Sequence, residues 1–308
     1  MNKVLIVIGG PTAVGKTALA IRVAKHFDTE ILSADSRQFY REMDIGTAKP
    51  TAEERALVKH HFIDSLSIFD AYDVGMYEKD ALNALKDLFA RKDSAVMVGG
   101  SGLFIRAVTD GFDDIPRVPS EVRERVNRLF EDEGIEALQT RVSELDPTYY
   151  SQVDQKNPAR LIRALEVIES SGKPFSSFRT RKSNKRDFDI IYVALDAERE
   201  QLYTRIDLRM DEMIKNGLFG EAERLAPHAK LNALQTVGYR EIFGYLDNQY
   251  DKAEAVRLLK RNSRRYAKRQ LTWFKKDQRF DWFTGDQTSR IIEHINLKLQ
   301  ALHAQNLN

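Results

Sequence analysis

The stretch VLIVIGGPTAVGKT at residues 4–17 decides the fold of this chain. Its first five residues are all apolar, as in a strand that is covered on both faces of a sheet. Residues 10–17 match the P-loop pattern G-x-x-x-x-G-K-[ST], and an amphipathic stretch at residues 16–27 predicts a helix directly after it. A strand, a glycine-rich turn and a helix in this order predict a loop that binds phosphate.

The residue types of this loop explain how a phosphate would be held. Glycines let the backbone curl, so that its N–H groups point at the phosphate from the positive end of the helix. Lys16 adds a positive charge, and the hydroxyl of Thr17 is a suitable Mg²⁺ ligand. A tight turn alone would explain the glycines but not the lysine and threonine in register. We therefore assign phosphate binding to Gly10, Pro11, Thr12, Ala13, Val14, Gly15, Lys16 and Thr17.

Alternating strand and helix patterns predict an α/β fold, with a P-loop NTPase-like parallel sheet flanked by helices. Further strands are expected at residues 30–33, 95–98, 188–195 and 280–283, and a helix at 77–91. Residues 120–171 instead carry apolar residues at helical spacing, and the polar, basic stretch 173–186 predicts a loop. We therefore expect the core in residues 1–115 and 187–308, with an all-helical insertion domain at residues 116–186.

Charge is distributed unevenly along the chain, although its formal net value is only +2. Residues 256–279 contain ten Lys or Arg and one acid, a local charge of +9, so the remainder sums to −7. Arg257, Arg261, Arg264 and Lys268 recur there at spacings that place them on one face of a helix. Such a stripe is typical of a surface that follows nucleic-acid phosphates, but a solvated basic helix has the same pattern.

The chain contains no cysteine, which excludes disulfides, thiolate metal sites and cysteine nucleophiles. This composition fits a reducing cytosol. The apolar run at residues 4–8 is too short for a signal peptide or a membrane span. We therefore expect a cytoplasmic protein that does not bind membranes.

A carboxylate, Asp35, follows the second expected strand. Ligands of an open α/β sheet bind at the carboxyl ends of its strands, so Asp35 and the P-loop should face one crevice. Asp35 could act there as a general base, or it could cap a following helix. The strand at residues 95–98 runs into Gly-Gly-Ser-Gly instead of the acid that many P-loop hydrolases carry, which weakens an ATPase interpretation.

Six blocks occur in an order that resembles the tRNA dimethylallyltransferases, also called tRNA isopentenyltransferases. They are GPTAVGKT (10–17), SADSRQFYREMDIGTAKP (33–50), VGGSGLF (98–104), NPARLIRALEV (157–167), VGYRE (237–241) and KRQLTWF (268–274). The resemblance extends from residue 3 to about residue 285. It implies transfer of a dimethylallyl group from dimethylallyl diphosphate to N6 of adenine 37, next to the anticodon of a tRNA.

The resemblance also implies roles for individual residues. Asp35 would accept a proton from the N6 amino group, and the P-loop would hold diphosphate instead of ATP. Lys16, Thr17, Ser101 and Mg²⁺ would stabilise charge on the diphosphate. Arg209 would reach the same group, with Arg205 as the alternative.

The expected partner is the anticodon stem-loop of tRNA, bound by a monomer. The adenine, which must leave its stack to react, would be held by Asp35, Ser36, Arg37, Gln38 and Ser101. Further contacts are implied for Arg123, Ala159, Arg160, Leu161, Ile162, Arg163, Gly238, Tyr239, Arg240, Arg261, Arg264, Lys268 and Arg269. Ala159 stands where the family usually has Gln, which makes a side-chain contact there doubtful.

Two other classes of protein share some of these features. A small-molecule or nucleotide kinase would use the P-loop to bind ATP, but has no need of the basic segment. A non-catalytic RNA-binding protein would tolerate changes of Asp35 and Lys16.

Overall fold

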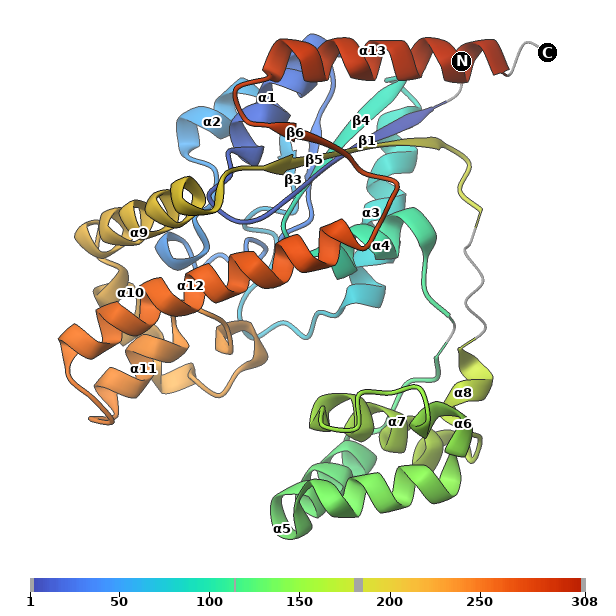
Figure 1. Ribbon diagram of the computed structural model, residues 1–308, viewed down its shortest axis with the longest axis vertical. Coiled ribbons are helices and arrows are strands. Elements are labelled where there is room, and N and C mark those ends of the chain that lie inside the picture. Colours follow the sequence, from blue (N-terminus) through green and yellow to red (C-terminus); the bar gives the residue numbers. More distant parts are fainter. Residues whose placement is uncertain (1–2, 114, 180–184, 306–308) are drawn as a thin grey trace. The chain divides into compact units, whose positions relative to one another are not determined.

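A computed structural model of the chain describes residues 3–113, 115–179 and 185–305. The chain divides into two compact units, one formed by Met1–Asp110 with Arg186–Asn308 and the other by Gly111–Lys185 (Figure 1). The domain limits expected from the sequence lie close to these boundaries, at residues 115 and 186. The assignment of a function to each of these parts stays a prediction.

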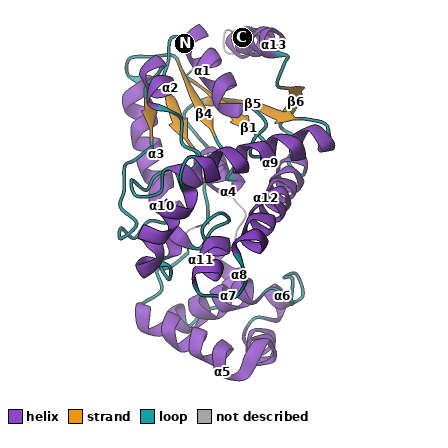
Figure 2. Ribbon diagram, turned by 90° about the vertical axis from the view of Figure 1, so that its left-hand side faces the viewer, coloured by secondary structure: helices purple, strands orange, loops and turns teal. Residues whose placement is uncertain are grey.

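The first unit contains a sheet of six strands in the described part of the chain (Figure 2). Its order is β3-β2-β4-β1-β5-β6, and every neighbouring pair is parallel. The predicted α/β fold with a parallel sheet is confirmed. The strands are β1 (Val4–Gly9), β2 (Ile31–Ser33), β3 (His60–His61), β4 (Ser94–Val98), β5 (Asp189–Asp196) and β6 (Asp281–Thr284).

Alternate residues of the strands point to opposite sides of this sheet. Helices cover both sides, and a separate core lies on each. Val4, Ile6 and Ile8 of β1 pack in a core with α1 (Lys16–His26) and α13 (Thr288–Gln305). Leu5 and Val7 belong to a second core with α3 (Val74–Phe89) and α4 (Gly102–Asp110). The continuous apolar run at residues 4–8 is therefore explained by burial of the strand on both faces.

A third core lies beside the sheet and is built mainly by the C-terminal third of the chain. It joins α9 (Arg199–Lys215), α10 (Leu218–Leu225), α11 (Arg240–Leu246) and α12 (Lys252–Lys275). Residues of the loop before α2 (Ala52–Leu57), including the short 3-10 helix η1 (Ile45–Thr47), pack against it. Two more 3-10 helices, η2 (Ala226–His228) and η3 (Asn232–Leu234), connect α10 to α11.

The described residues of the second unit form helices and no strand. They are α5 (Ser120–Leu145), α6 (Pro147–Tyr150), α7 (Pro158–Ser171) and α8 (Phe175–Phe178). Gly134 breaks the helical geometry within α5, and Asn157 caps α7 through a hydrogen bond from the Arg160 N–H. The expectation of a loop throughout residues 173–186 was wrong where α8 forms, because Phe175 packs into the core of this unit. Residues 180–184 of that stretch lie outside the described residues.

Two arginines anchor the points at which the chain leaves and re-enters the first unit. Arg186 donates hydrogen bonds to the carbonyls of Ala107 and Val108 at the end of α4, and pairs with Glu78 at 2.7 Å. Arg279 pairs with Asp110 at 2.6 Å. The end of α4 is thus held from two directions.

No helix in the described ranges is long and apolar enough to cross a membrane.

Glu30, directly before β2, accepts contacts from three basic side chains. Its carboxylate lies 2.6 Å from Arg91, 2.6 Å from His61 and 3.4 Å from Lys59. The hydrogen bond from Arg91, followed by that from His61, outweighs the effect of burial and lowers the pKa of Glu30 to about 2. This cluster fixes the start of β2 to the neighbouring strand and to the end of α3.

We expect Glu30→Gln to lower the free energy of unfolding by about 1–2 kcal/mol at neutral pH, because charge-assisted hydrogen bonds are lost. The pKa of Glu30 is depressed in the folded protein. Its carboxylate therefore contributes to the free energy of unfolding above about pH 4.5, and this contribution is lost as pH falls toward about 2. The difference between wild type and variant in urea unfolding should therefore shrink on acidification. Glu223→Gln, at an exposed position of α10, is the control and should leave stability unchanged.

Candidate active site

The P-loop connects the end of β1 to the start of α1. Gly10, Ala13 and Gly15 adopt positive φ angles of 136°, 62° and 104°, which fold the backbone over the first turn of the helix. A Cβ on Gly10 would lie 2.6 Å from the carbonyl oxygen of Leu195, so only glycine fits there. Backbone turns of this kind direct N–H groups into a concave site for an anion.

Lys16 curls back over this loop. Its ammonium donates a hydrogen bond of 2.6 Å to the carbonyl of Pro11. Burial, followed by the positive charge of Arg209, lowers the pKa of Lys16 to about 7, although the carboxylate of Asp35 opposes the shift. Because the lowered pKa reflects burial beside another cation, a bound anion would restore the charged form.

Gln270 of α12 joins the P-loop to the loop that follows β4. The amide N–H of Thr12 donates to its Oε1 at 2.9 Å, and its Nε2 donates to the carbonyl of Gly100 at 3.0 Å. A Cβ on Gly100 would lie 2.2 Å from Nε2. Gln270 belongs to the KRQLTWF block of residues 268–274, but its local pattern does not indicate a position in the site.

Asp35 lies at the carboxyl end of β2, close to the end of β4. Its Oδ1 accepts a hydrogen bond of 2.9 Å from the N–H of Arg37, so it orients a turn and does not cap a helix. Ser101, which follows β4, accepts from the N–H of Ser36 at 3.2 Å. A Cβ on Gly99 would lie 2.2 Å from the carbonyl oxygen of Ala34, so this glycine permits the close approach.

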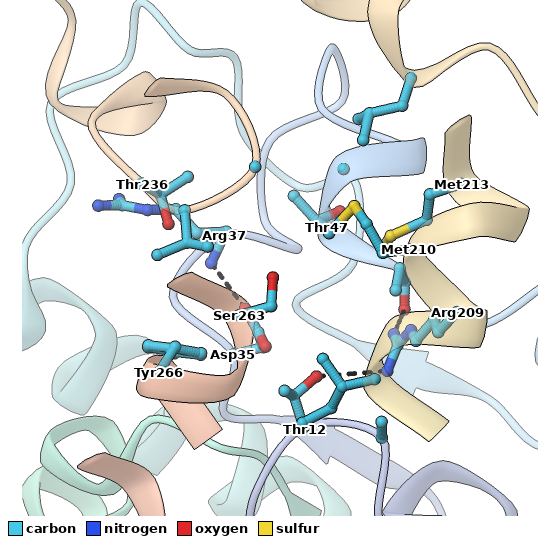
Figure 3. Close-up of a pocket in the computed structure, with 17 residues that line it drawn as sticks. Thr12, Asp35, Arg37, Thr47, Arg209, Met210, Met213, Thr236, Ser263 and Tyr266 are labelled. Atoms are coloured by element: carbon cyan, nitrogen blue, oxygen red, sulfur yellow. Dashed lines mark hydrogen bonds between the residues drawn. The ribbon is translucent and has the colours of Figure 1, made fainter. Parts of the chain in front are cut away.

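Of these segments, Thr12 and Ala13 of the P-loop and the carboxylate Asp35 border a cavity of about 760 Å³, a volume that includes the open solvent at its mouth. Thr12, Asp35 and Arg209 supply polar groups, and Figure 3 shows Arg209 directed at Thr12 with Asp35 on the other side. Arg37, Thr47, Thr236, Ser263 and Tyr266 also line it, and an apolar wall is formed by Ile206, Met210, Met213, Leu218 and Val237. The cavity therefore combines an anion-binding end with an apolar wall.

Arg209 bridges the two sides of this cavity. Its Nη1 donates to the hydroxyl of Thr12 and its Nη2 to the carbonyl of Ala48, each at 3.3 Å. Arg205, the alternative considered from the sequence, is exposed on the same helix. Of the two, Arg209 is the arginine that lines the cavity.

Tyr266 and Ser263 of α12 also line the cavity. Burial, followed by the negative charge of Asp35, raises the pKa of Tyr266 to about 12. Its hydroxyl is therefore protonated at neutral pH and can donate a hydrogen bond. The helical spacing of Tyr266 indicated its inward direction but could not show that a cavity lies there.

The donor set near the P-loop fits Mg²⁺ bound largely through phosphate and water. In the described ranges, no group of three or more His, Cys, Asp or Glu side chains could hold a metal ion. Mg²⁺ commonly takes few protein ligands when substrate phosphates and waters complete its shell. The hydroxyl of Thr17, in the first turn of α1, is the residue that fits this arrangement.

The residues assigned to RNA from the family resemblance fall into several environments. Near the cavity, Arg37 and Gly238 line it, whereas the Gln38 amide donates to the carbonyls of Thr47 and Ala48. Arg240 is exposed, but Tyr239 is fully buried and donates to Glu221. The burial of Tyr239 does not support a contact between its side chain and RNA.

On α12, the structure separates residues that the sequence grouped in one stripe. Lys268 and Arg269 are exposed. Arg264 pairs with Asp207 of α9 at 2.6 Å, and Arg257 pairs with Glu254 at 2.6 Å. Arg261 is half-buried and donates to the side chain of Asn262. The stripe is thus partly neutralised, by Glu254 on the same helix and by Asp207 on α9, which helical spacing within α12 could not reveal.

In the helical unit, Arg123 and Arg163 each hydrogen-bond the buried carboxylate of Glu166 at 3.3 Å. Both arginines remain partly exposed, as do Ala159, Arg160 and Ile162. Leu161 is fully buried in the core of this unit, which favours a structural role for its side chain. A contact with RNA stays a prediction for the exposed positions.

Fold and site define a P-loop protein in which the phosphate loop faces a carboxylate across a partly apolar cavity. A family model described as IPP transferase matches residues 38–277. A tRNA dimethylallyltransferase of Christiangramia forsetii is 53% identical over 300 residues, which cover 97% of this chain and 99% of the relative. The chain belongs to this family, the IPP transferases.

Solved structures agree with this assignment. A tRNA isopentenylpyrophosphate transferase from Bacillus halodurans matches with a TM-score of 0.74 and 36% identity, over 100% of both chains. A eukaryotic dimethylallyltransferase acting on tRNA matches with a TM-score of 0.72 and 25% identity, over 88% of this chain and 69% of the other. The predicted family resemblance is therefore confirmed.

We expect inorganic pyrophosphate to bind with uptake of a proton by Lys16. With its pKa lowered to about 7, a substantial fraction of the Lys16 amines is neutral at pH 7 in the free protein, and the bound anion raises the pKa, so a fraction of a proton is taken up. Affinity should fall as pH rises above 7. Titration calorimetry in two buffers of different ionisation enthalpy measures the uptake. The Lys16→Arg variant stays charged in the free protein and should therefore bind pyrophosphate without this proton uptake. Equal proton uptake by wild type and variant would contradict the assignment of the proton to Lys16.

Proposed function

We propose that the protein transfers a dimethylallyl group from dimethylallyl diphosphate to N6 of adenine 37 in tRNA, releasing diphosphate. The observation that carries this proposal is the meeting of a P-loop, a carboxylate and an apolar wall in one cavity. The names of the relatives support the same reaction. With tRNA as its substrate, we place the protein in the cytoplasm and expect it to act as a monomer.

The anion-binding end of the cavity suits the diphosphate. Backbone N–H groups of the P-loop, the Lys16 ammonium and the Arg209 guanidinium all supply positive charge where the leaving group gains negative charge. The Thr17 hydroxyl would hold Mg²⁺ together with the phosphates. Bound there, the ion neutralises part of the charge on the departing diphosphate.

The apolar wall suits the five-carbon group. Met210 and Met213 lie on one face of α9, and Leu218 begins α10 beyond them. Methionine side chains adapt to irregular apolar shapes, and each buried methylene gains about 0.8 kcal/mol. This wall orients the allyl carbon toward the acceptor and excludes water from it. Phosphoryl transfer by a kinase does not itself require an apolar wall beside the P-loop, whereas transfer of a five-carbon hydrocarbon group does.

Asp35 is placed to accept the proton that N6 loses when the new bond forms. Its Oδ1 is oriented by the Arg37 N–H, and the carboxylate faces the cavity between Tyr266 and Thr12 (Figure 3). Adenine reaches this position only after leaving its stack, because N6 is shielded within a stacked loop. Ser36, Arg37 and Ser101 surround the turn and supply the hydrogen-bonding groups that would hold the extruded base.

Incubation of the protein with unmodified tRNA, Mg²⁺ and dimethylallyl diphosphate should yield prenylated adenosine, detected by mass spectrometry of the digested nucleosides. Parallel reactions with ATP test the kinase alternative, and we expect no phosphorylated product. Absence of prenylated adenosine would contradict the proposed function.

Asp35→Asn should lower turnover by about 10²–10⁴-fold, because a positioned base is lost. Its tRNA affinity should be retained, and near-normal turnover would remove Asp35 from this role.

We expect Lys268→Ala with Arg269→Ala to reduce the salt dependence of tRNA affinity by about 1–2 units of slope, because each exposed cation releases counterions on binding. Binding is measured by filter retention over a series of salt concentrations. Arg257→Ala is the comparison, since Arg257 is paired with Glu254 on the same helix. If the Lys268/Arg269 double variant and Arg257→Ala change the slope equally, ion pairing does not determine which cations contact RNA.

A further inference from the structure

A buried carboxylate outside the cavity, that of Glu221 on α10, holds the loop that forms one of its walls. Glu221 is 2% exposed. It accepts hydrogen bonds from three consecutive backbone N–H groups, those of Asp44 at 3.1 Å, Ile45 at 2.8 Å and Gly46 at 2.9 Å. A buried carboxylate is costly unless it is hydrogen-bonded. Here the donors come from a segment about 175 residues away in the sequence.

Tyr239 completes the arrangement from α11. Its hydroxyl donates to Glu221 at 2.6 Å, and its side chain is fully buried. The ring lies so close to Gly46 that a Cβ there would meet it at 2.5 Å. Gly46 is thus fixed by packing on one side and by the carboxylate on the other. Neither Glu221 nor Tyr239 is among the residues that line the cavity.

The segment held in this way reaches the reacting groups. Gly46, Thr47 and Ala48 line the cavity. The carbonyl of Ala48 accepts a hydrogen bond from Nη2 of Arg209, while Nη1 of the same guanidinium donates to the Thr12 hydroxyl in the P-loop. A shift of residues 44–48 would therefore withdraw one of the two contacts that orient Arg209.

We propose that Glu221 is a positioning residue, which fixes residues 44–48 and through the Ala48 carbonyl sets Arg209 against the P-loop. Arg209 is thereby oriented for a diphosphate before the ligand arrives. This inference rests on the proposed function only in the assignment of the diphosphate to Arg209. The fixing of residues 44–48 can be measured without any ligand.

The first measurement is amide hydrogen exchange in the free protein. In Glu221→Gln, the side-chain NH₂ cannot accept from backbone N–H groups, so we expect faster exchange at residues 44–46 by at least about tenfold. Glu30→Gln is the control, because it removes a partly buried, ion-paired carboxylate of the same unit that lies directly before β2 and makes no contact with residues 44–46. It should leave exchange at residues 44–46 unchanged. Unaltered exchange in Glu221→Gln would overturn the proposal.

The second measurement is the affinity for inorganic pyrophosphate by calorimetry. Glu221→Gln should weaken binding about 10- to 10²-fold, as expected when a binding group is misplaced, and Glu30→Gln should not weaken it. Tyr239→Phe keeps three of the four hydrogen bonds and should have a smaller effect, about two- to threefold. Equal affinity of wild type and Glu221→Gln would overturn the proposal even if exchange increases.

A double-mutant cycle separates positioning from general damage. In an Arg209→Ala background, Glu221→Gln should change pyrophosphate affinity by less than about twofold, because the guanidinium through which it acts is absent. An equal loss in both backgrounds would show that Glu221 does not act through Arg209. If the wild-type protein does not bind pyrophosphate, the proposed function is contradicted. The fixing of residues 44–46 is a separate claim, which hydrogen exchange tests without any ligand.

Discussion

Parallel pairing of β1 between β4 and β5 is the constraint on which the site depends. The register sets Ile8 beside Val98 and Gly9 beside Ala194, so β1 and β4 end at nearly the same level, while β5 continues to Asp196. β2 joins them through the pairing of Ser33 with Val98. The segments that follow these strands carry the P-loop, Asp35 and Ser101. Their proximity results from the hydrogen-bonding pattern of the backbone, before any side chain contributes.

Helices from the C-terminal third complete what the sheet begins. Gln270 and Tyr266 of α12 and Arg209 of α9 reach the ends of the strands from positions far along the sequence. Both helices also contribute to the third core, with Met210 and Leu259. The polar residues are thus held in place by apolar packing immediately behind them. This explains how a cation such as Arg209 can be kept oriented beside a second cation, Lys16.

The sheet and the phosphate end of the site could be predicted from the sequence because their signals are local. The P-loop, Asp35 and the strand at residues 4–8 each stand in a short segment whose pattern identifies them. Gln270 and Glu221 could not be found in this way, since their significance depends on backbone groups 170 or more residues distant. Arg264 was grouped with free cations because helical spacing shows its face but not Asp207 on the neighbouring helix. The roles of the individual site residues stay predictions.

The two anchors at the end of α4 have a consequence for how the family's chains can vary. Arg186 and Arg279 bind the carbonyls and the acid at the end of one helix, Ala107, Val108 and Asp110. The chain therefore leaves the sheet-containing unit at a fixed point and is fixed again where it returns. We expect changes in the length of residues 111–185 to leave the register of β5 against β1 undisturbed. We expect the helical unit to diverge more readily among relatives than the sheet and the strand ends that carry the site residues.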